Sequence, residues 1–243
     1  VQLAGFMNIN GDYTDGIQMA GMTNITLGPV KGSQLGGFSN HSGYMDGLQM
    51  AGSMNFSKGG KGSQMAGGLN VSNGTYEGLQ LSGGLNYTSV LQGIQVGVVN
   101  IADSVSSGFM LGVINWTKNG LHHFELSTND VTPYNLAFKS GVFPFYTILR
   151  AGINPHDTQI WDYGMGFGSS HHIKKRASID FESTYHTIQA LDKGYMDGFN
   201  AEIRFQTRFG YQFANHMRLL AGPVLHYLIF NPNDPEHIGF ADR

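Results

Sequence analysis

The chain has 243 residues, of which 41% are hydrophobic and only 13% are charged, with 35 glycines and a formal net charge of −3. This balance gives no reason to expect a nucleic-acid partner, because phosphate binding needs clustered Lys and Arg. The longest apolar runs are far too short for membrane-spanning helices, so any membrane contact must be made by strands. The sequence contains no cysteine, which excludes disulfides and thiolate chemistry. Val1 already lies inside a repeat, so we expect a processed or truncated product.

Residues 1–119 carry an internal repeat with a step of 15 or 16 residues. Each unit joins about ten residues of alternating character to about five residues of turn chemistry, as in 48–57 followed by 58–62. Apolar and small polar side chains alternate in 48–57, which indicates a strand because successive side chains leave opposite faces of the pleat. We therefore interpret each unit as one strand and one turn. The polar face supplies the candidates for lining a lumen, which are Gln18, Asn24, Gln49, Asn55, Gln64, Asn70, Gln80 and Asn86.

A second, longer period favours an up-and-down connection of these strands. The residue before the glycine that opens each unit alternates in charge, from Asp15 to Lys31 to Asp46, and tyrosine accompanies only the acidic turns. In an up-and-down sheet alternate turns lie at opposite ends, so one rim would collect these tyrosines, as in the aromatic girdle of a membrane barrel. The candidates for this girdle are Tyr13, Tyr44 and Tyr76.

A β-solenoid is the alternative architecture for residues 1–119. If each unit were one coil, the same pattern would stack acid on base, Gln on Gln and Asn on Asn. Recurrent glycines such as Gly37, Gly52 and Gly67 support this alternative, because a corner requires glycine whereas a lipid-facing strand gains no packing from it. The solenoid also requires every ten-residue strand to bend near its middle, which the barrel does not.

Residues 120–243 continue as strands with more charge. In 201–213 large aromatic and aliphatic residues alternate with charged or polar ones, which is the pattern of a strand between lipid and a wet lumen. Segments 161–168 and 179–186 show the same division into two faces. The candidates for lining a lumen in this half are Asp180, Glu182, Glu202, Arg204 and Arg208.

The two halves together predict one all-β domain over 1–243. We expect an antiparallel up-and-down transmembrane β-barrel of about 14–16 strands, since closed bacterial barrels have an even strand number. Its first part would be the Gln/Asn repeat strands of 1–119, and its second part the non-repeat strands of 120–243. The alternative fold is an N-terminal β-solenoid followed by a smaller barrel.

The repeat resembles a family of Gram-negative outer-membrane surface-repeat proteins, which occur alone or behind a carboxypeptidase-regulatory-like domain. The likeness rests on G-[IL]-Q-x-x-G-x-x-N units in 1–117, and on later segments that include 99–104, 112–116, 124–129, 164–168 and 220–223. It covers nearly the whole chain. The resemblance implies an outer-membrane or surface location, and it supplies no catalytic or ligand residues.

The sequence predicts no enzyme, cofactor or metal site. Adjacent histidines such as His122 and His123 would point to opposite faces of a strand and could not easily bind one metal. The acidic residues of 120–243 could form a carboxylate pair for acid/base work, but a charged lumen lining balanced by arginines is the simpler interpretation. Segment 164–168 lacks the following helix that a nucleotide-binding glycine loop needs.

Two functions follow as hypotheses. The first is a non-enzymatic outer-membrane protein, serving as a structural or accessory subunit of an envelope complex. The alternative is a porin-like passive channel for small polar solutes, with the Gln/Asn face lining the pore. The expected partners are outer-membrane lipid and other envelope proteins.

Overall fold

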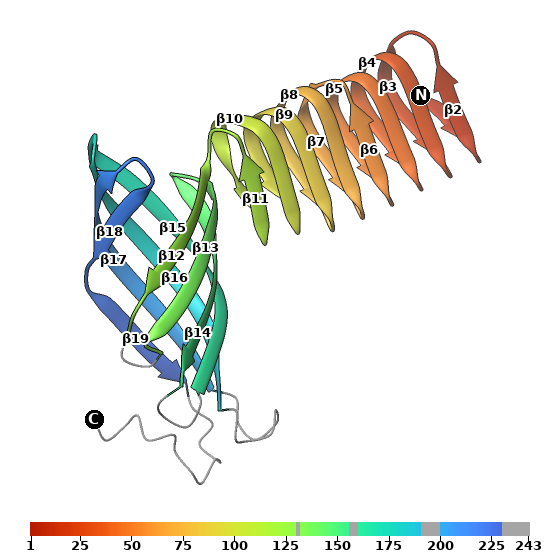
Figure 1. The fold of residues 1–243 in the computed structure, drawn as a ribbon. Coiled ribbons are helices and arrows are strands. Elements are labelled where there is room, and N and C mark those ends of the chain that lie inside the picture. The colour runs from red at the N-terminus through yellow and green to blue at the C-terminus, as the bar shows by residue number, and fades with distance from the viewer. Residues whose placement is uncertain (130–131, 156–159, 191–199, 230–243) are drawn as a thin grey trace. The chain divides into compact units, whose positions relative to one another are not determined.

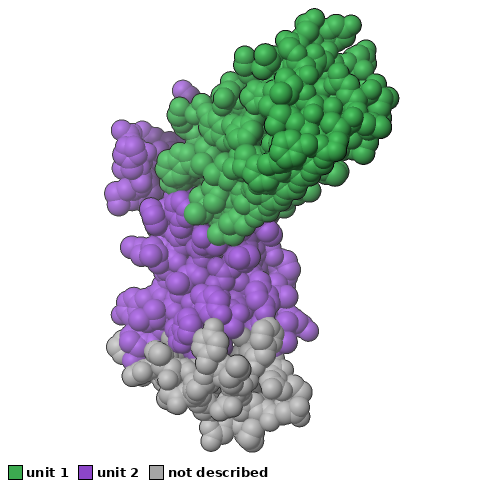
Figure 2. Space-filling model, turned by 90° about the vertical axis from the view of Figure 1, so that its right-hand side faces the viewer, with its two compact units in different colours: residues 1–122, 140–142 green, residues 123–139, 143–243 purple. Residues whose placement is uncertain are grey.

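The computed structural model describes residues 1–129, 132–155, 160–190 and 200–229, and their strands form two sheets (Figure 1). The chain divides into two compact units. Unit 1 comprises Val1–His122 and Ser140–Val142, and unit 2 comprises His123–Lys139 and Phe143–Arg243 (Figure 2). No helix in the described residues has the length and apolarity that a membrane span requires. The prediction of an all-β protein is confirmed.

The first sheet has eleven strands and is wound into a β-solenoid (Figure 1). Its strands pair in parallel, and equivalent positions of successive repeats face one another, as Gln34 faces Gln49 and Gln49 faces Gln64. The strands are β1 (Gln2–Ala4), β2 (Met7–Asn10), β3 (Thr14–Ala20), β4 (Thr23–Gly36), β5 (Ser39–Ala51), β6 (Met54–Ser57), β7 (Gly60–Ala66), β8 (Leu69–Ser82), β9 (Leu85–Val96), β10 (Val99–Leu111) and β11 (Ile114–Thr117).

Each coil of the solenoid has two faces, one carrying the Gln and the other the Asn, and two corners where the chain turns. We call the turn that follows each Gln the glycine corner. It consists of the residue pairs Gly5-Phe6, Gly21-Met22, Gly37-Phe38, Gly52-Ser53, Gly67-Gly68, Gly83-Gly84, Gly97-Val98 and Gly112-Val113.

We call the opposite turn, between each Asn and the next Gln, the charged corner. Every Asp, Glu and Lys of residues 1–120 lies at this corner or next to it, and this stretch contains no Arg. The charged residues are Asp12, Asp15, Lys31, Asp46, Lys58, Lys61, Glu77, Asp103 and Lys118. Differences in repeat length fall here, because Asn follows Gln after six residues in each unit up to Asn86, whereas the next Gln follows after nine or ten.

The predicted antiparallel barrel strands of residues 1–119 are therefore wrong, and the solenoid alternative is the architecture found. The expected strand 48–57 bends at Gly52-Ser53. At this bend the coils approach so closely that a Cβ on Gly52 would clash with the carbonyl oxygen of Gly37 in the preceding coil. Only glycine allows this approach, which explains why the bend recurs at a glycine and not at another small residue.

A second glycine column lies on the Gln face and has backbone angles that other residues rarely adopt. Gly32, Gly47 and Gly62 have φ of 123°, 134° and 108° and follow one another in the parallel register. A Cβ on Gly47 would meet the backbone of Gly32. The glycine that opens each repeat is thus fixed by both conformation and close packing.

The second sheet has eight strands in the order β12 to β18, with β19 also paired to β17. Strands β14 to β19 pair antiparallel, and the sheet curls into a half-barrel (Figure 1). The strands are β12 (Leu121–Ser127), β13 (Tyr134–Val142), β14 (Phe145–Asn154), β15 (Ile160–Lys174), β16 (Ala177–Ala190), β17 (Asn200–Ala214), β18 (Met217–Ala221) and β19 (Val224–Ile229).

This half-barrel matches the alternative fold in part. β18 and β19 pair with different ends of β17 and are separated at 222–223. The alternation predicted for 201–213 is present, since Arg204 and Arg208 are buried while Phe205 and Phe209 are 51% and 61% exposed. The outer face of the curl therefore carries the aromatic residues, and the inner face carries the charges.

Candidate functional site

Two ladders of side-chain amides run through the interior of the solenoid. Each Gln Nε2 donates to the Oε1 of the Gln in the preceding coil, at 2.8 Å from Gln49 to Gln34 and 2.7 Å from Gln64 to Gln49. Each Asn Nδ2 donates in the other direction, to the Oδ1 of the following coil, at 2.9 Å from Asn55 to Asn70. The two ladders thus point their amide dipoles in opposite directions. An amide can be stacked in this way because it carries both a donor and an acceptor.

The Asn ladder also fastens the glycine corner. Asn40 Nδ2 donates to the carbonyl oxygen of Met50 at 2.7 Å, and Asn55 Nδ2 donates to that of Met65 at 2.8 Å. Both carbonyls lie two residues before a corner glycine, where the chain is about to turn. At the bend, this backbone oxygen no longer takes part in the hydrogen bonds between strands. The spacing of six residues from Gln to Asn places the Asn amide where it can donate to that oxygen instead.

The predicted lumen residues of the repeat are consequently inside the coil and not in a barrel lumen. Their amides are fully buried and bonded to one another along the stack of coils, as Gln49 is to Gln34 and Gln64. All eight of these residues are fully buried, namely Gln18, Asn24, Gln49, Asn55, Gln64, Asn70, Gln80 and Asn86.

The three girdle tyrosines do not share one environment. Tyr13 and Tyr44 are exposed, whereas Tyr76 is fully buried in the solenoid. Tyr76 precedes its repeat glycine by two residues and the others by three, so the alternation turns its side chain inward. Burial, with a smaller contribution from Tyr44, raises the pKa of the Tyr76 phenol above its ordinary value.

At the charged corner acid stacks on base, as the solenoid alternative requires. Asp46 faces Lys61 in the register, and their side chains form an ion pair at 3.4 Å. Lys118 Nζ lies 2.9 Å from Asp103 Oδ1, and its hydrogen bond lowers the pKa of that carboxyl. These groups are solvent-exposed and are worth little to stability.

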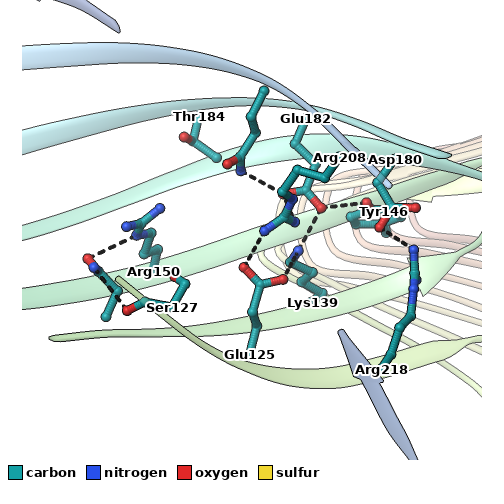
Figure 3. Close-up of polar contacts among 12 residues, drawn as sticks. Glu125, Ser127, Lys139, Tyr146, Arg150, Asp180, Glu182, Thr184, Arg208 and Arg218 are labelled. Carbon is teal, nitrogen blue, oxygen red and sulfur yellow. Dashed lines mark hydrogen bonds and ion pairs between the residues drawn. The ribbon is translucent and has the colours of Figure 1, made fainter. Parts of the chain in front are cut away.

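The inner face of the half-barrel carries a cluster of buried charges centred on Glu182 (Figure 3). Lys139 Nζ lies 2.6 Å from Glu182 and 2.5 Å from Glu125. Arg208 bridges the same two carboxylates, with one guanidinium nitrogen 2.6 Å from each. The Tyr146 hydroxyl also donates to Glu182 at 2.6 Å. We call Glu125, Lys139, Tyr146, Glu182 and Arg208 the central cluster; it joins β12, β13, β14, β16 and β17.

Two further groups of charges extend this network along the inner face. Arg218 pairs with Asp180 at 2.5 Å, and Ser170 donates to the same carboxylate at 2.6 Å. Arg204 lies 2.5 Å from Glu202 and 3.4 Å from Asp162. All five predicted inner-face residues are buried, and each takes part in an ion pair: Asp180, Glu182, Glu202, Arg204 and Arg208.

Several members of the network were not singled out from the sequence as lumen candidates, among them Lys139, Tyr146 and Asp162. Lys139 is only 4% exposed and is the third buried residue of the alternation that begins at Asn135 and Ala137. That alternation in 135–139 is the signal that could have found it. Tyr146 has no such signal, because buried residues run consecutively through 146–148.

In the central cluster the opposite charges neutralise one another. Each carboxylate of the central cluster is bound by two cations, which leaves neither free to take up a proton from a substrate. Among the described residues, no group of three or more His, Cys, Asp or Glu side chains is placed to hold a metal ion. His171 and His172 lie on opposite sides of β15, where they contact Phe181 and Phe143 respectively.

No family model, curated protein or solved structure matches this chain. The resemblance to Gram-negative surface-repeat proteins therefore stays a prediction, and the function must be argued from the two units themselves.

Proposed function

We propose that the half-barrel is a lipid-facing anchor in the outer membrane, and that the chain is a non-enzymatic structural or accessory protein of the envelope. The observation that carries this proposal is the inversion of polarity across the second sheet, with charges buried on its inner face and aromatic side chains exposed on its outer face. A water-soluble sheet protein normally buries its apolar face. The opposite arrangement is the pattern of a strand wall whose outer surface meets lipid.

The outer face is apolar over several neighbouring strands. Its exposed side chains on β15, β16 and β17 include Tyr163, Met165, Phe167, Phe181, Tyr185, Phe205, Phe209, Tyr211 and Phe213. Apolar patches of this extent on soluble proteins mark surfaces that are covered by a partner or a membrane. Lipid fits this face because it is convex and spread over consecutive strands, as the curl in Figure 1 makes plain.

The central cluster counts against the porin-like alternative. Interiors of sheets with about eight strands are only wide enough to be filled by side chains. Here Lys139, Arg208 and Glu182 occupy that space and bind one another at 2.6 Å. A solute path along the inner face would have to break these buried ion pairs. We therefore favour the structural or accessory role over a passive channel.

Fluorescence quenching by lipids with brominated acyl chains tests the proposal. The chain has two tryptophans, so a background with Trp116→Phe and Trp161→Phe lets a single reporter be placed by Phe209→Trp. We expect this reporter to be quenched in vesicles of brominated phosphatidylcholine, and Lys58→Trp at the charged corner of the solenoid not to be quenched. Equal, weak quenching at both positions in folded protein would contradict the anchor.

Conductance across a planar bilayer separates the two functions. The proposed anchor should insert without producing discrete, long-lived conductance steps. Reproducible steps from the purified protein would favour the passive channel instead. Recovery of the protein as a soluble monomer from a detergent-free lysate would overturn both.

A further inference from the structure

The glycine corner forms an apolar edge that runs the length of the solenoid. The outward column just before it is apolar in every coil: Leu3, Met19, Leu35, Met50, Met65, Leu81, Val96 and Leu111. Phe6, Phe38 and Val98 at the corner itself are 64%, 45% and 51% exposed. Eight coils at about 4.8 Å per parallel strand make this edge roughly 34 Å long. An apolar strip of this length on an otherwise water-exposed coil calls for a covering surface.

Charge is segregated from this edge within every coil. The charged residues of residues 1–120 lie at or next to the charged corner, on the other side of the Gln and Asn faces. The cross-section of the solenoid is therefore amphipathic, with one edge suited to water and one to an apolar medium. This division is the one that interfacial amphipathic helices use to lie on a bilayer surface.

Backbone amides of the glycine corner also donate to carbonyl oxygens of the preceding coil. The amide of Phe38 donates to the carbonyl oxygen of Met22 at 2.8 Å, and the amide of Ser39 donates to the same oxygen at 3.0 Å. Ser53 and Met54 repeat this pattern on the carbonyl of Phe38, at 3.0 and 3.1 Å. Turns on soluble proteins usually leave such groups to solvent, whereas a chain segment in contact with lipid must bond them internally.

The Gln and Asn side chains next to this edge are also hydrogen-bonded within the solenoid. The amides of the Gln and Asn ladders point into the coil, and Asn40 and Asn55 bond the carbonyls just before the corner. The edge thus presents apolar side chains and few free polar atoms. A protein partner would ordinarily be recognised through some directed hydrogen bonds at the interface. Lipid requires none, and it therefore fits this edge better than a protein does.

We infer that the glycine corner of the solenoid rests in the surface of a lipid bilayer, with the charged corner in water. This surface belongs to unit 1 and goes beyond the anchor proposed for unit 2. The solenoid would then be a membrane-lying element of the protein in its own right. Shallow insertion at the level of the headgroups and first acyl carbons is sufficient, since only one corner is apolar.

Single-cysteine labelling of the full chain tests this inference, because the native sequence has no cysteine. An environment-sensitive fluorophore is attached at Met22→Cys and, in a separate variant, at Val98→Cys, which lie toward opposite ends of the edge. Lys58→Cys at the charged corner is the matched control, and Phe209→Cys reports independently on the proposed anchor. The protein is reconstituted in phosphatidylethanolamine/phosphatidylglycerol vesicles that carry nitroxide-labelled lipid.

We expect lipid nitroxide to quench the labels at Met22 and Val98 severalfold more than the label at Lys58, with the opposite order for aqueous iodide. Quenching at Phe209 without quenching at Met22 and Val98 would overturn the inference and leave the anchor standing. Quenching at Met22 and Val98 without Phe209 would support the inference while the anchor fails. Labels at the edge that are shielded from both quenchers would mean that a second copy or another protein covers it, which also overturns the inference.

Discussion

Both units bury many polar side chains, but the hydrogen-bonding needs of these side chains are met in different ways. The solenoid stacks identical neutral amides, so that Gln49 bonds Gln34 and Gln64 in a parallel register. The half-barrel pairs opposite charges across antiparallel strands, as Lys139 and Arg208 do with Glu182. An amide is its own complement, because it both donates and accepts. A carboxylate is not, since like charges in close stacking repel.

This difference explains why one interior is repetitive and the other is not. Parallel stacking places each residue on its own equivalent in the next coil, and a buried polar side chain tolerates this only if it is self-complementary. The charges of unit 1 are therefore confined to a solvent-exposed corner, where Asp46 and Lys61 alternate. Unit 2 buries its charges and must supply a different partner for each one, which requires strands of unlike sequence.

Removal of a buried charge from the central cluster should have the largest effect. Glu182→Leu removes one of the two carboxylates that bind Lys139 and Arg208, leaving Glu125, and it also removes the acceptor of the Tyr146 hydroxyl. We expect unit 2 to lose about 3–5 kcal/mol of unfolding free energy, the usual effect of breaking a buried ion pair. Urea unfolding in detergent, followed through Trp161 after Trp116→Phe, measures this loss. Glu77→Leu at the exposed charged corner is the control. An equal loss of unfolding free energy there would show that the buried ion pairs of the central cluster contribute no more to stability than an exposed charge does.

Interruption of an amide ladder should have a smaller effect that depends on position. Gln49→Leu removes the donor to Gln34 Oε1 and the acceptor of Gln64 Nε2, so each of these two buried groups loses a hydrogen bond. We expect a loss of about 2–4 kcal/mol, because each orphaned group costs about 1–3 kcal/mol and the leucine recovers part of it.

The end of the ladder supplies the matched comparison. Gln95 donates to Gln80 at 2.8 Å, but its own Oε1 has no hydrogen-bond partner, so Gln95→Leu orphans fewer groups. It should destabilise unit 1 by roughly half as much as Gln49→Leu. Unfolding followed through Trp116 after Trp161→Phe measures both variants. Equal losses would contradict the picture of a continuous, self-complementary ladder.

The smallest of the three effects is expected at the glycine corner. Gly52→Ala places a methyl group against the carbonyl oxygen of Gly37 and should cost about 1–3 kcal/mol, as overpacking of a tight site does. Gly5→Ala in the first coil is the control, since a Cβ there has nothing within 4 Å. Thermal unfolding of the two variants compares them. If both leave the midpoint unchanged, close approach of the coils is not what fixes glycine at this corner.

The sequence predicted the faces of the strands better than their direction. The alternation of residues 48–57 and 201–213 correctly separates buried from exposed side chains in both units. Period two reports only which side of the pleat a residue occupies. It carries no information on whether a neighbouring strand runs parallel or antiparallel. The alternation of the repeat was therefore equally compatible with a barrel and with a solenoid.

Two details of the repeat, its recurrent glycines and its spacing, indicate the parallel direction of the strands. A bend at Gly52-Ser53 turns one apparent ten-residue strand into two short ones, and the glycine column marks it. The spacing of six residues from Gln to Asn, which holds in every unit up to Asn86, against nine or ten residues back to the next Gln, also indicates that one corner is fixed and the other is not. The partners within the central cluster could not be predicted, because Glu125 and Arg208 are 83 residues apart and meet only through the curl of the sheet.

The most direct test of the comparison between the two interiors is the direction of strand pairing in the repeat. Asp46 and Lys61 are register partners in adjacent parallel coils, whereas an antiparallel hairpin would place them far apart and would instead bring Met50 close to Leu69. Disulfides form only between residues whose Cα atoms lie within about 7 Å. We predict efficient oxidation of the Asp46→Cys/Lys61→Cys pair in the otherwise cysteine-free chain, and none of the Met50→Cys/Leu69→Cys pair. The reverse result would contradict the parallel stacking of the amides.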